Sequence, residues 1–338
     1  MELQRRIVLH ASRGANLAFC RAMHLRAAAV ARPDAAAGKH VGVEPVGSLK
    51  RTVIHYKMRV LSVPLGRLGN AVFRYLATII YHIVFDATIV HPQITGADKY
   101  LMVTDEQFIY WMNAHLNGNI LGLDKDTTYG FFGYFQHDTI YLKYRSQIID
   151  YIRTHPKDVL TTDGNYETRT DFKYFPTDYL SDILLNAPQG FKKYYDTVVH
   201  LRLEDFMDNG MAIHPLYIKQ LLESIGAPSY CLVMNSPDTE LELSYIEYLR
   251  KYFNVIIESN DIITDYHIMK NAKTLVCSTS TISWAAAFFS DTVQRVYMPN
   301  YPAKRPHETF RKPIENTMAY DYKTCSKREL EEYLRTAV

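Results

Sequence analysis

Apolar and polar positions from residue 58 onward fall into short blocks that predict strands and helices in alternation. The clearest strand is Thr197-Val-Val-His-Leu201, whose β-branched run is typical of a buried strand. The other expected strands are Met58–Pro64, Ala87–Val90, Phe131–Phe135, Tyr230–Met234, Val255–Glu258, Thr274–Cys277 and, as the last, Val293–Met298. The expected helices are Asn70–Val84, a helix capped at Thr104 or Asp105 that runs to His115, Tyr141–Ile152, Pro215–Ile225, Glu240–Tyr252, Thr264–Asn271 and Thr281–Phe289. Strands that alternate with helices of this length predict parallel sheets with helices on both faces.

The length of 338 residues is enough for about two domains of ordinary size. We expect the fold class α/β, with two Rossmann-type domains that face a central cleft. The N-terminal domain is predicted to span 58–190 and the C-terminal domain 191–338, which ends in a helix. Ligands of open parallel sheets bind outside the carboxyl ends of the strands. The cleft is therefore the expected place for a site.

Residues 1–57 differ in composition from the rest of the chain. They carry ten basic and three acidic residues, a net charge of +7, whereas the remainder carries 28 basic and 33 acidic residues, a net charge of −5. An Arg-rich, acid-poor leader is typical of an organelle transit peptide. The alternative, which we adopt, is a disordered extension or non-native upstream sequence. The negative charge of the remainder gives no reason to expect nucleic-acid binding.

Cysteine spacing and hydropathy both bear on the compartment. The chain contains four widely separated cysteines, Cys20, Cys231, Cys277 and Cys325. They match no zinc-site spacing, and two of them lie in expected strands, so we expect reduced thiols. The best candidate for a membrane span, Leu76–Val90, is interrupted by His82 and Asp86. We therefore predict a cytoplasmic protein without a membrane span, in the host cytoplasm if the chain is viral.

The first candidate segment is Gly66-Arg-Leu-Gly-Asn70, between the first expected strand and the helix that follows. Glycine lets the backbone turn tightly and approach a ligand, and a helix N-terminus offers free amide groups. A purely structural turn would use the same residues. In the functional interpretation, Gly66, Gly69 and Asn70 shape the first-domain side of the cleft.

The second segment is His200-Leu-Arg-Leu-Glu-Asp205, at the carboxyl end of the clearest strand. The planar guanidinium of Arg202 can make two charge-assisted hydrogen bonds to a pyrophosphate. Glu204 or Asp205 could take a proton from an attacking hydroxyl group. The alternative is a histidine packed at the end of a strand, next to a surface ion pair.

The third segment is Cys277-Ser-Thr-Ser-Thr-Ile-Ser283, where an expected strand ends and a helix begins. Five hydroxyl side chains crowd this turn. Together with the unpaired amides of a helix start, hydroxyl groups suit a phosphate. Capping by Ser280 or Thr281 would need only one hydroxyl, so the surplus favours ligand binding.

These segments resemble, in the same order, the motifs of the alpha-1,2-fucosyltransferase family. The family's Gly-Gly-Leu-Gly-Asn turn resembles Gly66–Asn70, and its Gly-Tyr-Phe-Gln stretch is matched by Gly133–Gln136. Its His-x-Arg-Arg-x-Asp hallmark aligns with 200–205, and its Asn-Ser-Ser-Phe-Ser-Trp-Trp-Ala-Ala motif is similar to Thr279–Ala287. The chain thus resembles a divergent viral or microbial member of the family.

The resemblance implies a GT-B-like fold and an inverting, metal-independent glycosyltransferase. Such an enzyme moves a sugar, here fucose from GDP-fucose, to a hydroxyl group of a glycan acceptor. It makes 58–190 the acceptor-side domain and 191–338 the nucleotide-sugar-binding domain, with no metal and no cofactor. The implied catalytic residues are Arg202, Asp205 and Glu204. The implied donor-binding residues are His200, Arg202, Asn235, Asp265, Ser280, Thr281 and Ser283.

Four positions depart from the family pattern. Leu203 stands at the second Arg of the hallmark, and Thr279, Ala285 and Arg67 replace an Asn, a Trp and a Gly. Alternation along the strand points Arg202 toward the site and Leu203 toward the core. Because one phosphate contact is lost, two alternatives stay open. One is another donor such as UDP-xylose, and the other is a non-catalytic glycan-binding protein derived from a transferase.

A competing motif is Asp124-Lys-Asp126. In metal-dependent transferases an Asp-x-Asp at a strand end holds a divalent cation that bridges the donor diphosphate. Here the motif lies in a polar stretch, and the interpretation we adopt is a solvated turn.

Overall fold

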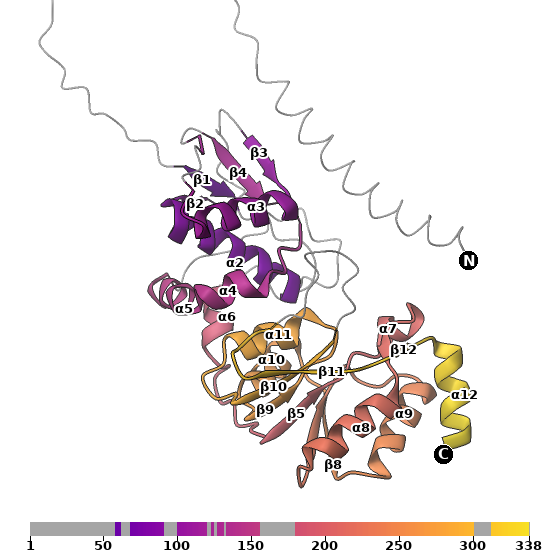
Figure 1. The fold of residues 1–338 in the computed structure, drawn as a ribbon. Helices are drawn as coiled ribbons and strands as arrows, with labels where there is room; N and C mark the ends of the chain where they lie inside the picture. The colour runs from indigo at the N-terminus through magenta and orange to yellow at the C-terminus, as the bar shows by residue number, and fades with distance from the viewer. Residues whose placement is uncertain are drawn as a thin grey trace, which may run out of the picture. The chain divides into compact units, whose positions relative to one another are not determined.

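Two parallel β-sheets, one after the other in the chain, organise the computed structural model (Figure 1). The structure describes residues 58–61, 68–90, 100–119, 123–124, 127–131, 133–155, 180–300 and 312–337. The predictions made for 1–57, Gly66 and Asp126 lie outside the described residues. The predicted α/β fold class, with two Rossmann-type parallel sheets, is confirmed.

The first sheet has the strand order β2-β1-β4-β3, and all of its paired strands are parallel. Its elements and their helices are β1 (Arg59–Leu61), α2 (Leu68–Phe85), β2 (Thr88–Val90), β3 (Tyr100–Val103), α3 (Asp105–Leu116), β4 (Thr128–Phe131), α4 (Asp138–Lys143) and α5 (Arg145–Thr154). α3 begins as predicted, because the Thr104 Oγ1 accepts the backbone N–H of Gln107.

The sequence pattern is wrong in three places in this half. β3 was not predicted, and β4 ends at Phe131, where the predicted strand begins. Beyond β4, Phe135 takes a left-handed backbone conformation with φ of 52°, which an extended strand cannot contain. The predicted helix 141–152 is divided at Tyr144 into α4 and α5. Aromatic residues are common in strands, but this preference depends on how their side chains pack.

The second sheet has the order β11-β10-β9-β5-β7-β8, again with parallel neighbours throughout. Counted along the chain, its six strands follow the 3-2-1-4-5-6 order of a Rossmann fold. Its elements and their helices are α6 (Leu180–Leu185), β5 (Thr197–His200), α7 (Glu204–Asp208), α8 (Pro215–Ile225), β7 (Tyr230–Val233), α9 (Glu240–Arg250), β8 (Val255–Glu258), α10 (Ile262–Lys270), β9 (Thr274–Val276), α11 (Thr281–Phe288), β10 (Arg295–Pro299) and β11 (Thr317–Tyr320). A short antiparallel pair, β6 (Ala212–Ile213) with β12 (Thr324–Cys325), and helix α12 (Lys327–Ala337) complete it.

β10 is not the last strand, contrary to the prediction. β11 pairs with it in parallel, with Thr317 opposite Val296. β11 lies at the edge of the sheet, and its two middle side chains, Met318 and Ala319, are exposed. An edge strand of this kind carries no buried β-branched run that a sequence pattern would detect.

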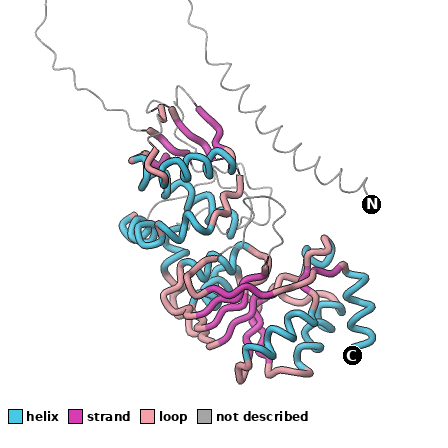
Figure 2. The backbone as a smooth tube through the Cα atoms, viewed as in Figure 1, coloured by secondary structure: helices cyan, strands magenta, loops and turns pink. Residues whose placement is uncertain are grey.

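Two hydrophobic cores cover the two faces of the second sheet, and helices lie on either side of it (Figure 2). α8, α9 and α12 pack on the face that carries Val199, and α10 and α11 pack on the face that carries Val198. The core on the Val198 face continues through α2 into the first sheet. Cys231, Cys277 and Cys325 are buried free thiols.

α2 is mostly apolar and lies inside this shared core, although its polar residues Asn70, Arg74, Thr78 and His82 recur every four positions. By length and composition alone it could cross a membrane, since its 18 residues have a mean hydropathy of 1.3. In the structure 72% of it is buried within the protein. A largely buried helix of this kind is typical of the core of a protein.

Aromatic packing around Trp284 joins α11 to α2. The centroid of its ring lies 4.4 Å from that of Phe73 on α2 and 4.9 Å from that of Phe288, onto which it stacks. The Trp284 side chain is fully buried, and its Nε1 has no hydrogen-bond partner among the described residues.

We expect Trp284→Ala to lower the free energy of unfolding by about 3–5 kcal/mol, because it leaves a large cavity between two helices. Trp284→Phe should cost much less, since it keeps a ring and removes a buried N–H that lacks an acceptor. Denaturant unfolding of both variants measures the difference. Equal losses in the two variants would show that ring packing is not what holds α11 on α2.

Candidate functional site

The fold places all four sequence motifs at the points where the two sheets are expected to bind ligands. Strand order reverses between β5 and β9 in the second sheet, and β1 and β4 are the two central strands of the first. Ligands of open parallel sheets bind outside the carboxyl ends of the strands, in particular at such a reversal. The segments that follow these four strands contain Gly66–Asn70, Gly133–Gln136, 200–205 and Thr279–Ala287.

In the second sheet, His200 ties the end of β5 to the turn after β9. Its Nδ1 lies 2.9 Å from the Oγ of Ser278, which also accepts the backbone N–H of Ser280 at 3.2 Å. Burial lowers the pKa of His200 to about 4. His200 is therefore neutral at physiological pH and acts as a hydrogen-bonding group rather than as a cation.

The hydroxyl groups at the start of α11 bind mainly within the protein. The Oγ of Ser283 donates to the carbonyl of Ser280 at 3.1 Å. Ser280 is the N-cap residue, but within the part of the chain that the structure describes its side chain makes no capping hydrogen bond. The first amides of α11 thus keep the character of an anion-binding helix start.

Asn70 connects the first sheet to this helix start. Its Oδ1 accepts hydrogen bonds from the Oγ1 of Thr281 at 3.2 Å and from the Nε2 of Gln136 at 3.3 Å. Three of the four motifs therefore meet through one amide side chain. Gln136, which the Gly-Tyr-Phe-Gln stretch contains, was not among the predicted site residues.

Gly69 permits this meeting. A Cβ at this position would lie 2.3 Å from the Thr281 Oγ1 and 2.7 Å from the backbone nitrogen of Ile282. α2 can approach α11 this closely only without a side chain at this position.

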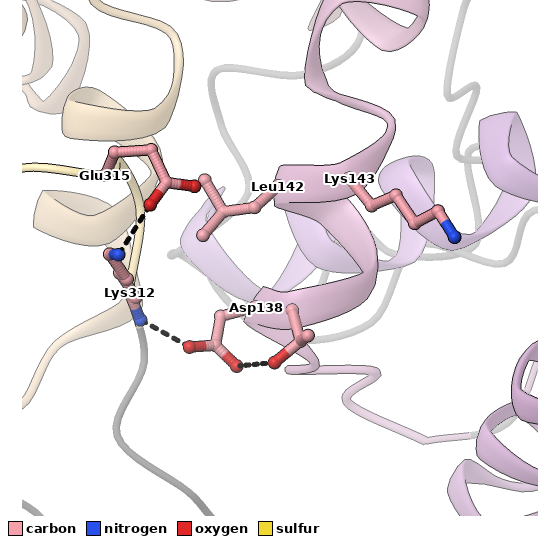
Figure 3. Close-up of a pocket in the computed structure, with 6 residues that line it drawn as sticks. Asp138, Leu142, Lys143, Lys312 and Glu315 are labelled. Atoms are coloured by element: carbon pink, nitrogen blue, oxygen red, sulfur yellow. Dashed lines mark hydrogen bonds and ion pairs between the residues drawn. The ribbon is translucent and has the colours of Figure 1, made fainter. Parts of the chain in front are cut away.

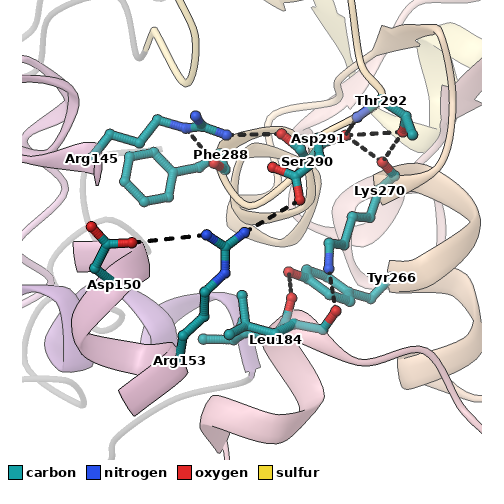
Figure 4. A network of polar contacts seen from close by, with 11 residues as sticks. Arg145, Asp150, Arg153, Leu184, Tyr266, Lys270, Phe288, Ser290, Asp291 and Thr292 are labelled. Carbon is teal, nitrogen blue, oxygen red and sulfur yellow. Dashed lines mark hydrogen bonds and ion pairs between the residues drawn. The ribbon is translucent and has the colours of Figure 1, made fainter. Parts of the chain in front are cut away.

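The far end of α11 is held by a cation from the first half of the chain. The Nε of Arg145 donates to the carbonyl of Phe288, and its Nη2 donates to the carbonyl of Ser290, both at 2.8 Å (Figure 4). On α10, the Nζ of Lys270 donates to the carbonyl of Leu185 at 2.7 Å. Cations at helix C-termini satisfy free carbonyls and complement the helix dipole.

Arg202 forms a compact ion pair at the start of α7. Its Nε and Nη2 lie 3.0 and 2.8 Å from the Oδ1 of Asp205, and Nη2 lies 3.9 Å from Glu204. Leu201 and Leu203 are buried in the core on the other side, so the predicted alternation is correct. The guanidinium retains further N–H groups for a ligand.

Glu242 fixes this ion pair from α9 and was not predicted. Its carboxylate accepts the backbone N–H groups of Glu204 at 3.1 Å, Asp238 at 2.9 Å and Thr239 at 3.0 Å. Thr239 and Glu242 form a capping box, and the Thr-x-x-Glu spacing was visible in the sequence.

Asp265 lies in a second polar cluster, beyond the carboxyl end of β8. Its Oδ1 accepts the backbone N–H of Asn260 at 3.2 Å and the side-chain amide of the same residue at 2.9 Å. Nearby Glu258 accepts from the Nζ of Lys193 at 2.5 Å and from the hydroxyl of Tyr195. Burial, with nearby carboxylates, raises the pKa of Asp265 to about 7, although the bonds from Asn260 oppose this. Predicted Asn235 is exposed, beyond the end of β7.

Of the Asp-x-Asp motif, the structure describes Asp124. The Oδ2 of Asp124 accepts the Oγ1 of Thr127 at 2.9 Å. Within the described ranges, no three His, Cys, Asp or Glu side chains gather as metal ligands would.

A hollow of about 310 Å³ lies between α4 and the segment before β11 (Figure 3). It is lined by Asp138, Thr139, Leu142, Lys143, Lys312 and Glu315. Its two basic and two acidic residues balance in charge. The backbone N–H of Lys312 donates to Asp138 at 2.6 Å, and its Nζ pairs with Glu315 at 2.7 Å. Because this lining includes no described residue from the four motifs, we place the candidate site at the carboxyl ends of the central strands instead.

Comparison with known proteins gives matches among solved structures alone. No family model and no curated protein matches the sequence. The chain is similar to NodZ alpha-1,6-fucosyltransferase co-crystallised with GDP, with 11% identity, a TM-score of 0.39, and coverage of 71% of this chain and 94% of that one. It is also similar to POFUT1 in complex with GDP, with 11% identity, a TM-score of 0.37, and 79% and 98% coverage. A third match is E. coli heptosyltransferase WaaC with ADP, with 12% identity, a TM-score of 0.35, and 83% and 100% coverage.

Gly69→Ala should lower the stability of the protein by about 1–3 kcal/mol, because the new methyl group overlaps the backbone of α11. Alanine at a helical position ordinarily stabilises by about 0.5–1 kcal/mol, so the expected sign is reversed. The melting temperature measures the effect. An unchanged or raised melting temperature would contradict the close approach of the two helices.

Asp265→Asn should stabilise the protein in a pH-dependent way. The folded protein keeps the Asp265 proton up to about pH 7, whereas the unfolded chain releases it near pH 4. The Asp265 contribution to wild-type stability is therefore fully present below about pH 4 and is lost as the pH rises to 7. The difference in melting temperature, variant minus wild type, should grow from pH 4 to pH 7 and stay constant above.

Asp261→Asn is the matched control. Burial opposes ionisation of Asp261, but hydrogen bonds from Thr264 and Ile263 hold its pKa below the usual value. Its contribution to stability is present above its unfolded pKa and is lost on acidification, so this variant should not gain stability as the pH rises. A flat difference for Asp265→Asn across pH 4–7 would contradict the raised pKa.

Proposed function

We propose that this protein is a glycosyltransferase that moves a sugar from a nucleotide sugar to a hydroxyl group of a glycan acceptor, with inversion at the anomeric carbon. The observation that carries the proposal is the junction of the motifs beyond the carboxyl ends of the central strands of the two sheets. Side-chain hydrogen bonds connect His200 with Ser278 and connect Asn70 with both Thr281 and Gln136. Residues this far apart in the chain converge on one place. It lies at the carboxyl ends of strands, where open parallel sheets bind their ligands.

The chemistry requires charge stabilisation on the leaving diphosphate and a base for the acceptor hydroxyl. Arg202 can give its free N–H groups to the diphosphate, and the first amides of α11 can bind the same charge. When the guanidinium of Arg202 turns toward the phosphate, its ion pair with Asp205 weakens. The Asp205 carboxylate can then take the proton of the acceptor's hydroxyl group. Glu204 is the second candidate for the base. Preorganised donors of this kind act where charge develops in the transition state.

GDP-fucose is the donor we propose, on the strength of the motif resemblance. Leu203 is buried in the core, so the position of the family's second Arg faces away from the Arg202 side. The fold therefore tolerates leucine at this position. His200, Asp265, Ser280, Thr281 and Ser283 remain the proposed donor-side residues, and the transfer is proposed to need no metal.

Arg202→Ala should reduce kcat/KM for the donor by roughly 10- to 150-fold, because a hydrogen bond to a charged group contributes roughly 1.5–3 kcal/mol and each 1.36 kcal/mol is tenfold in rate. Arg202→Lys should restore only part of the rate, since an ammonium group cannot reproduce the fork. The measurement is turnover of GDP-fucose and of UDP-xylose, with the melting temperature taken alongside.

Arg250→Ala is the control, because Arg250 pairs with Glu247 at 2.6 Å on the outer helix α9 and is 44% exposed. It should leave turnover unchanged. A folded Arg202→Ala variant with normal turnover would remove Arg202 from the proposed site. If none of GDP, UDP and CMP raises the melting temperature of the wild type, the proposed function is contradicted. Binding without transfer would identify the glycan-binding alternative.

A further inference from the structure

The segment after β4, residues 133–137, is fixed by the carboxylate of Asp105, and we call it the Asp105 loop. The Oδ1 of Asp105 accepts the backbone N–H of Phe135 at 2.7 Å, and Oδ2 accepts that of Tyr134 at 3.1 Å. A Cβ at Gly133 would lie 1.9 Å from this carboxylate, so glycine permits the approach. The loop is therefore built around one partly buried acceptor group.

Further contacts hold the loop in a strained backbone conformation. Phe135 is fully buried at a φ of 52°, which is uncommon for a bulky side chain. Its carbonyl accepts the Tyr141 hydroxyl at 2.5 Å, and His137 lies 3.4 Å from Asp105. Burial opposes ionisation of Asp105, but hydrogen bonds from His137 and Phe135 keep its pKa below the usual value. Such strain persists where the surroundings over-determine the backbone, and it clusters at functional sites.

Tyr134 is the solvent-exposed aromatic residue of the Asp105 loop. It is 58% exposed, between Gly133 and the fully buried Phe135. It lies two residues before Gln136, which bonds Asn70 at the junction of the motifs. A large aromatic side chain with only two rotatable bonds, carried on a rigid loop, loses little conformational entropy when a ligand covers it.

We infer that Tyr134 is the stacking platform for a pyranose ring of the glycan acceptor, an inference that rests on the sugar transfer proposed above. The face of an aromatic ring carries negative charge density. The C–H groups on one face of a pyranose carry weak positive charge, so the two faces attract each other while the sugar hydroxyls stay in water. The Tyr134 hydroxyl can add one hydrogen bond.

The position of Tyr134 favours an acceptor sugar over the nucleotide. It belongs to the first sheet, whereas Arg202 and the start of α11, which would hold the diphosphate, belong to the second. A nucleobase would also stack on an exposed ring, and the experiment separates these two ligands.

The experiment measures saturation-transfer NMR of lactose, cellobiose and xylobiose with the full chain, in the presence and absence of GDP. At least one disaccharide should bind the wild type through its ring C–H groups. Tyr134→Ala should bind it about tenfold more weakly, which is the scale of one aromatic contact. Tyr134→Phe should keep most of the binding. Tyr110→Ala is the matched control, because Tyr110 is an equally exposed tyrosine (66%) on α3, and it should leave binding unchanged.

Three results would overturn the inference. The first is a wild type that binds none of the three disaccharides, and the second is a Tyr134→Ala variant that binds them as well as the wild type. The third is a Tyr134→Ala variant that loses GDP and keeps the disaccharide, which would assign the ring to the nucleotide. The rise in melting temperature that GDP or UDP gives to the wild type tests the proposed function separately. It should be the same in Tyr134→Ala.

Discussion

The contact between α2 and α11 is the constraint on which the rest of the structure depends. At one end of α11, Gly69 allows backbone to approach backbone, and Asn70 bonds the side chain of Thr281. In the middle, Trp284 packs on Phe73. At the far end, Arg145 holds two free carbonyls. Each helix leads away from a central strand of its own sheet, so this contact also sets how the motifs at the carboxyl ends of these strands meet.

The candidate site separates neutral groups from charged ones. The groups that join its segments are neutral: a histidine whose pKa burial lowers to about 4, hydroxyl groups and two amides. The charge is concentrated in one pair, Arg202 with Asp205, which Glu242 positions through the backbone of α7. Hydrogen bonds between neutral groups cost little to bury, whereas a partly exposed ion pair can exchange partners when a ligand arrives.

Much of the second sheet could be predicted because its inner strands are largely buried on both faces, as the β-branched run Thr197–His200 is. Alternation also gave the correct sides for Leu201 and Leu203. The misses have tertiary causes. β11 is an edge strand without a buried run, and the aromatic stretch after Phe131 is turned by the carboxylate of Asp105, which is distant in sequence. The partners of Asn70 and His200 were not predictable either, since spacing along the chain does not say which side chains meet.

The hydrophobic core that runs from the first sheet through α2 and α11 into the second sheet has a consequence for folding. Neither half can detach without exposing a large apolar surface to water, which opposes separation roughly in proportion to the area uncovered. The two halves should therefore lose their structure in a single cooperative event rather than one after the other. Whatever movement accompanies a catalytic cycle then belongs to the segments around this shared core, and not to a hinge through it.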